Sequence, residues 1–175
     1  MGYSTMMFGV DLDQIQRAVA EHDIRVVAAA KEANPEAYDH KLDDSDPTAG
    51  EALHTIITGG PFDPNADHQY GYALKLMCET LGEWLPDDDM IGDLEPLELQ
   101  SPLEKYRCPI DIPANQGFPF IAFLTADEVQ HEAKRLESID LSFPNDEDIE
   151  EAREAFANCV NEAATKNLAI VTFYY

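Results

Sequence analysis

The sequence predicts an α+β fold, in which a small sheet is flanked by about six helices. Three stretches rich in aromatic and β-branched residues are typical of strands: an N-terminal one at residues 3–10, a central one at 118–124 and a C-terminal one at 168–175. Between them, apolar residues recur at spacings of three and four, which is typical of amphipathic helices. Three strands are too few for a doubly wound fold, so we expect helices packed on one small sheet.

Two short helices are expected after the first strand. Asp11 precedes the first of them and Gln14 stands three residues on, as in a capping box. The second helix should stop before Pro35, because the residue before a proline avoids the helical region. Its apolar side consists of Ile24, Val27 and Ala30. The acidic, breaker-rich residues 34–47 are expected to form an exposed loop.

Two further helices are predicted in the middle of the chain. Thr48 and Glu51 form a capping box for the first, and Gly59 is expected to end it. The second has the clearest helical periodicity, and Lys75 and Glu79 are expected to pair on its outer face. Its apolar residues are Tyr70, Ala73, Leu74, Met77, Cys78, Leu81 and Leu85.

The second half begins with an irregular region over residues 87–117, in which residues 97–100 suggest a short edge strand. Pro119 lacks an amide hydrogen, so the central strand either starts there or lies at an edge. Helices capped by Thr125 with Glu128 and by Asn145 follow, and acidic residues in the first turn of the last helix complement its positive end.

The last strand, residues 168–175, is apolar along nearly its whole length (LAIVTFYY). This pattern is typical of a strand covered on both faces. We expect it to be central and to pair with the N-terminal strand. Since there is no internal repeat and no long linker, residues 1–175 are predicted to form a single domain.

Charge restricts the choice of partners. The chain has 11 Lys and Arg against 35 Asp and Glu, a net charge of −24. Binding to nucleic acid or to an anionic membrane is not expected, because it depends on basic residues that neutralise phosphates. An acidic surface instead favours a basic protein partner, although adaptation to a saline cytoplasm explains the charge equally well. One acidic cluster without a structural explanation is the candidate partner surface: Asp87, Asp88, Asp89, Asp93 and Glu95.

The segment from Gly59 to Tyr72 is the candidate ligand site. This segment connects two predicted helices and contains several side chains that can bind a ligand or take part in catalysis. His54 on the preceding helix could lie beside them. The candidate residues are Asp63, Asp67, His68, Tyr70, Tyr72 and His54. This hypothesis, a small enzyme or a ligand-binding domain, predicts a concave pocket beside the turn. The alternative is a rigid connector between helices, in which Gly, Pro, Asn and Asp serve the turn.

Metal and cofactor motifs are not matched. Asp63, Asn65 and Asp67 imitate the first half of a calcium loop, but His68 and Leu74 stand where that loop needs Gly and Glu. No HExxH, P-loop, GxGxxG or GxSxG is present, so we expect neither a metal, a cofactor nor a catalytic residue. The three cysteines form no CxxC pair and are expected to be free, as in a reducing cytoplasm.

Four stretches carry a family resemblance: GYSTMMFGVDLD, GGPFDPNADHQYGYALKLMCETLGEWL, FPFIAFLTADEV and VTFYY. They resemble a group of uncharacterised bacterial proteins, domains of unknown function of this length. More loosely, the chain is similar to the YfbM-like family of small α+β proteins. The resemblance implies a bacterial, cytoplasmic protein with a binding or regulatory role, for example an immunity protein, rather than a metabolic enzyme. The oligomeric state is left open.

Overall fold

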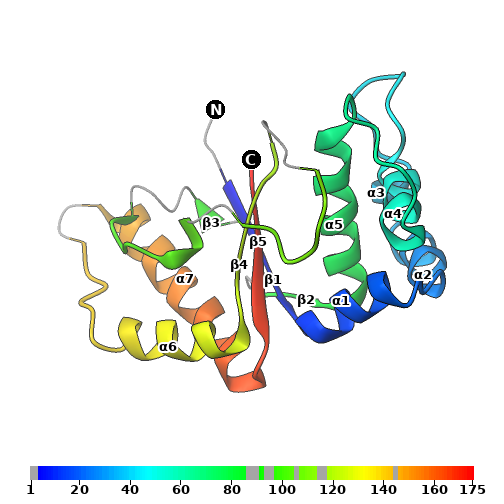
Figure 1. The fold of residues 1–175 in the computed structure, drawn as a ribbon. Helices are drawn as coiled ribbons and strands as arrows, with labels where there is room; N and C mark the ends of the chain where they lie inside the picture. Colours follow the sequence, from blue (N-terminus) through cyan, green and yellow to red (C-terminus); the bar gives the residue numbers. More distant parts are fainter. Residues whose placement is uncertain (1–3, 86–90, 93–96, 105–106, 114–117, 144–145) are drawn as a thin grey trace.

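The computed structural model describes residues 4–85, 91–92, 97–104, 107–113, 118–143 and 146–175 (Figure 1). Within these ranges the chain forms seven α-helices and one five-stranded antiparallel sheet, which confirms the α+β prediction. The strands are β1 (Ser4–Val10), β2 (Glu83–Trp84), β3 (Ile91–Gly92), β4 (Phe120–Leu124) and β5 (Ala169–Tyr174). The helices are α1 (Leu12–Ala20), α2 (Arg25–Ala33), α3 (Pro35–Tyr38), α4 (Ala49–Thr58), α5 (Asp67–Leu81), α6 (Ala126–Leu136) and α7 (Glu147–Lys166), with a short 3-10 helix η2 (Pro102–Glu104).

The sheet is organised around β5, as the sequence predicts. Its order is β2-β1-β5-β4, and β3 also pairs with β1. In the register, Val171 of β5 lies between Phe8 of β1 and Phe123 of β4. β2 and β3 have two residues each, which is too short to leave a period-two pattern in the sequence. For this reason three strands were predicted where the sheet has five.

Side chains alternate between two helical layers along β5, because successive residues of a strand point to opposite faces. Val171 and Phe173 pack with α1, α2, α4 and α5, whereas Ile170 packs with α6 and α7. Figure 1 shows the sheet between these two groups of helices. Each layer therefore has its own apolar cluster, and the two clusters share the sheet.

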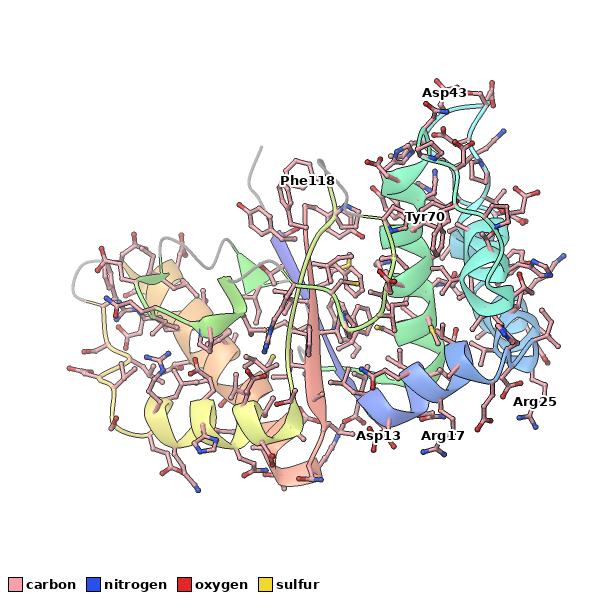
Figure 2. The ribbon with its side chains drawn as sticks, in the orientation of Figure 1. Asp13, Arg17, Arg25, Asp43, Tyr70 and Phe118 are labelled. Carbon is pink, nitrogen blue, oxygen red and sulfur yellow. The ribbon has the colours of Figure 1, made fainter. Side chains whose placement is uncertain are left out.

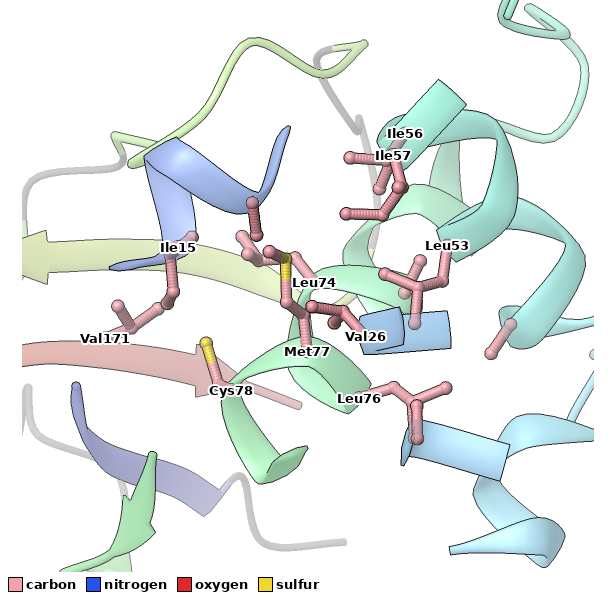
Figure 3. Packing of buried hydrophobic residues seen from close by; sticks show 14 of the residues in the cluster. Ile15, Val26, Leu53, Ile56, Ile57, Leu74, Leu76, Met77, Cys78 and Val171 are labelled. Carbon is pink, nitrogen blue, oxygen red and sulfur yellow. The ribbon is translucent and has the colours of Figure 1, made fainter. Parts of the chain in front are cut away.

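The larger cluster is built by α4 and α5 against the sheet (Figure 3). Leu53 and Ile57 of α4 and Leu74 and Met77 of α5 are fully buried. In Figure 3, Val171 of β5 faces Ile15 and Cys78. Burying a side chain of this size stabilises the fold by about 1.5–3 kcal/mol, so α5 is held firmly against both α4 and the sheet.

Helix ends follow their sequence signals. Both predicted Thr–Glu capping boxes, at Thr48 and at Thr125, form with reciprocal hydrogen bonds. Gly59 ends α4 with φ at +66°, in the left-handed region that favours glycine. The last helix differs by one position, because Asp146 supplies the N-cap side chain and Asn145 lies outside the described residues.

Two helical predictions are wrong in extent. α5 ends at Leu81, and the chain turns at Gly82 into β2, so Leu85 is not helical. A Cβ at Gly82 would lie 2.6 Å from the carbonyl oxygen of Gly9, which explains why glycine stands at this turn. In α2, Ile24 is 49% exposed and Val26 takes its expected place in the core.

Two loop predictions also need correction. Residues 34–47 are not entirely a loop, because Asn34 caps the single-turn helix α3 and Pro35 occupies its first position. Residues 97–100 do not form a strand. Glu98 and Gln100 have φ values of 53° and 49°, and this left-handed backbone is incompatible with an extended strand.

Deletion of residues 168–175 is expected to unfold the protein or make it insoluble. These residues include β5, whose Ile170, Val171 and Phe173 are fully buried. Their burial contributes several kcal/mol, at about 1.5–3 kcal/mol each, whereas a domain is stable by only about 5–15 kcal/mol. Circular dichroism and a thermal melt provide the measurement. A truncated protein with an unchanged melting temperature would contradict the central role of β5.

Replacing Gln69 by Leu is expected to stabilise the protein. Gln69 of α5 is fully buried, and within the described part of the chain its amide oxygen and nitrogen have no hydrogen-bond partner. Removing an unsatisfied buried amide should raise the free energy of unfolding by about 1 kcal/mol. Gln130→Leu is the matched control, since Gln130 donates to the carbonyl of Ala164 and should lose stability. Urea unfolding measures both, and a destabilised Gln69→Leu would refute the argument.

Candidate functional site

The turn before α5 is tied to the helix by Tyr70. The backbone N–H of Asp63 donates to the Tyr70 hydroxyl at 2.8 Å. Tyr70 is buried, and the Phe62 ring packs edge-on against it at 4.9 Å between centroids. Figure 2 places Tyr70 on α5 beside this turn. Through these contacts Tyr70 stabilises the turn, which agrees with the alternative that the segment is a rigid connector between helices.

His68 joins α5 to the acidic loop that follows α3. Its Nε2 lies 3.0 Å from Asp46 Oδ2, and its Nδ1 lies 3.6 Å from Asp67 Oδ1. In the shorter contact, the side chains of His68 and Asp46 are 23% and 13% exposed, so this pair is largely screened from water. The two contacts of His68 bring together two predicted site residues, Asp67 and His68, and one residue that was not predicted, Asp46. His54 is exposed on α4.

A cavity of about 390 Å³ lies farther along α5, and we call it the tyrosine cavity. Its lining comes from β1, from α3 and the loop that follows it, from α5 and from the residue that follows β5. Of the six predicted ligand-site residues, Tyr72 lines this cavity, and the other five do not. The lining residues are Met6, Glu36, Ala37, His40, Tyr72, Lys75, Leu76, Glu79 and Tyr175.

Helical periodicity brings the α5 residues of the cavity together. Tyr72, Leu76 and Glu79 stand four and three positions apart, and residues at these spacings share one side of a helix. The opposite wall depends on Asn34, whose Oδ1 accepts from Ala37 N and whose Nδ2 donates to Glu79 at 3.1 Å. Asn34 thus caps α3 and fastens it to α5. The Asn-Pro start of α3 was the sequence signal that could have found this wall.

The predicted ion pair of Lys75 and Glu79 forms, with Nζ 2.7 Å from Oε1. Its position differs from the expectation of an outer face. The two side chains are only 17% and 20% exposed and lie in the cavity wall. Because Glu79 accepts from both Lys75 and Asn34, its charge is compensated within the wall.

Three aromatic rings meet in the cavity. The Tyr72 ring lies 4.9 Å from the His40 ring and 5.9 Å from the Tyr175 ring, between centroids. The planes are inclined by 54° and 45°, respectively. Burial raises the pKa of the Tyr72 phenol, and that of Tyr175 further, with the charges of Tyr72 and Glu79 as smaller causes for Tyr175. Both phenols are therefore protonated at neutral pH.

Cys78, Cys108 and Cys159 form no disulfide with one another, as predicted, and Cys78 and Cys159 are buried. Burial raises the pKa of the Cys108 thiol to about 11 and also raises that of Cys78. Both thiols therefore carry very little of the reactive thiolate at neutral pH.

Among the residues that the structure describes, no three His, Cys, Asp or Glu side chains come close enough to hold a metal ion together. None of the helices described has the length and apolar character that crossing a membrane requires. The candidate partner surface, Asp87, Asp88, Asp89, Asp93 and Glu95, lies outside the described residues.

Comparison with known proteins places the chain in a family. A family model described as Domain of unknown function (DUF7691) matches residues 1–175. No curated protein and no solved structure matches the chain. The match confirms the resemblance to an uncharacterised domain family. The bacterial origin and the similarity to YfbM-like proteins stay predictions.

Tyr70→Phe is expected to destabilise the protein by about 1 kcal/mol, because the N–H of Asp63 loses its acceptor. The same variant should leave the tyrosine cavity unchanged, since Tyr70 does not line it. Tyr38→Phe is the matched control, because the Tyr38 ring that Lys31 faces at 5.4 Å is retained. Urea unfolding compares the variants. Equal stability of Tyr70→Phe and the wild type would show that the hydroxyl does not hold the turn.

Proposed function

The chain belongs to the DUF7691 family, a domain of unknown function, and we propose that it is a non-catalytic binding protein whose acidic surface meets a basic protein partner. A regulatory role is the form this would take, and an immunity protein that neutralises a basic toxin is one concrete version. Such a partner would be attracted by the net charge of −24.

The observation that carries this proposal is that most basic residues pair with acidic residues of the same chain. At least six of them form ion pairs with acidic residues of the same chain: Arg25, Lys41, Lys75, Arg107, Arg135 and Lys166. Most of the positive charge is thereby compensated locally. The excess carboxylates define the field that a partner meets.

Exposed carboxylates occur on two separate parts of the structure. Asp43 and Asp44 lie in the loop after α3, and Figure 2 shows Asp43 at the tip of this loop. The second group lies on α7: Glu147, Asp148, Glu151 and Glu154. Acidic groups on different elements give long-range attraction over a wide surface, and this raises association rates with a basic protein.

The chemistry of the buried groups supports binding rather than catalysis. A catalytic thiol or phenol works best when its pKa lies near the operating pH. Burial moves the pKa values of Tyr72, Tyr175, Cys78 and Cys108 upward, away from neutrality. These groups are suited to packing and to hydrogen bonding in their neutral forms.

The test is affinity capture from a lysate of the source organism, followed by purification of the captured partner and calorimetric titration. We expect a partner with a basic patch, and an affinity that falls roughly tenfold or more between about 50 and about 300 mM salt, because screening shortens the reach of surface charges. Asp43→Asn with Asp44→Asn should weaken binding and make it less dependent on salt.

The matched control is the double variant Glu151→Gln with Glu154→Gln, which removes two exposed carboxylates from a different element, α7. It changes the net charge by the same amount as Asp43→Asn with Asp44→Asn, so a comparison of the two double variants at equal charge locates the contact. A partner without a basic patch, or an affinity that is independent of salt, would contradict the proposal.

A further inference from the structure

The tyrosine cavity offers aromatic faces to a ligand. Tyr72, Tyr175 and His40 all line it, and their planes are inclined to one another rather than stacked in parallel. The face of an aromatic ring carries negative potential and attracts cations, most strongly where water is partly excluded. Tyr72 and Tyr175 are partly buried, which provides this condition.

The charges of the lining also favour a cation. Lys75 is compensated by Glu79 at 2.7 Å, and Glu79 accepts in addition from Asn34. Glu36 stands at the exposed side of the cavity, and its carboxylate has neither a hydrogen-bond nor an ion-pair partner among the residues described. The lining therefore has one carboxylate in excess, and a phosphate or carboxylate ligand would meet it unfavourably.

The remaining lining is apolar. Met6, Ala37 and Leu76 contribute hydrocarbon surface next to the rings. The volume of about 390 Å³ is typical of a small-ligand pocket, since such pockets span about 300–1,000 Å³. A ligand with a hydrocarbon stem and a cationic head would match this combination, because long cationic side chains bury their stems and keep their heads near polar groups.

We propose that the tyrosine cavity receives an arginine side chain of the basic partner, with the guanidinium group against the ring faces of Tyr72 and Tyr175 and near the carboxylate of Glu36. Arginine fits better than lysine, because its planar guanidinium stacks on aromatic rings and can donate several hydrogen bonds at once. The identity of the partner as a protein rests on the proposed function, whereas the cation chemistry rests on the cavity alone.

Two small probes test the cation chemistry directly. N-acetylarginine amide is titrated into the full chain, and tyrosine ring resonances are followed by NMR. N-acetylcitrulline amide is the matched control, because a neutral urea replaces the guanidinium with the same shape and stem. We expect the arginine probe to shift the Tyr72 and Tyr175 resonances and to bind roughly tenfold or more tightly than the citrulline probe. Equal affinities, or shifts elsewhere only, would overturn the inference.

Two pairs of variants test the assigned residues. Glu36→Gln should weaken the arginine probe roughly fivefold, whereas Glu32→Gln, which removes the same charge from an exposed position of α2, should change it little. Tyr72→Leu should weaken binding roughly tenfold, and Tyr72→Phe should retain it because the ring face is kept. Thermal melts confirm that the variants are folded. If Glu32→Gln matches Glu36→Gln, or Tyr72→Phe matches Tyr72→Leu, the assignment is wrong.

The outcomes separate this inference from the proposed function. If the basic partner binds Tyr72→Leu and the wild type equally and with the same salt dependence, the partner is real and the cavity is not its arginine site. If the arginine probe binds in the cavity but no basic protein binds the chain, the cavity chemistry stands and the proposed function fails.

Discussion

The position of β5 between β1 and β4 is the constraint on which the rest of the structure depends. Its side chains alternate between two helical layers, so each layer buries its apolar residues against the same strand. A strand covered on both faces has no side for an unpaired polar group. Thr172 meets this requirement because its hydroxyl donates to the carbonyl of Ala122 at 3.3 Å. The order of the sheet and the division of the helices into two layers both follow from this strand.

The same strand also fixes one wall of the tyrosine cavity. Tyr175 follows β5 and exchanges two backbone hydrogen bonds with Ser4, which holds its position beside the sheet. The opposite wall is α5, which the larger apolar cluster holds in place, and Asn34 fastens α3 to it. Because each wall is fixed by core packing or by hydrogen bonds, a ligand would have little chain to order on binding. Such preorganisation lowers the cost of association.

The sequence predicted the parts of the fold that repeat a local rule. The Thr48 and Thr125 capping boxes and the helical periodicity of α5 each depend on neighbouring residues, and they were found. The cavity depends on contacts between residues far apart in the chain, such as Tyr72 with Tyr175. Sequence periodicity does not predict such a contact. The ligand site was therefore predicted at the Gly59 to Tyr72 segment, of which Tyr72 alone lines the cavity. Short pairings such as β2 were missed for the same reason.

In the proposed function, long-range attraction and short-range discrimination of the partner have separate physical origins. Two cations of the chain fasten separate segments of the fold to one another: Arg153 donates to the carbonyls of Leu97 and Ser142, and Arg107 to the carbonyl of Phe123 and to Glu128. Cations used in this way leave the carboxylates to dominate the surface field, which acts over about 10 Å and would attract the proposed basic partner by charge alone. Charge alone discriminates poorly among basic proteins. Discrimination among basic proteins therefore requires short-range contacts that depend on the shape of the partner. The tyrosine cavity could provide them, because it combines ring faces, an apolar wall and the carboxylate of Glu36.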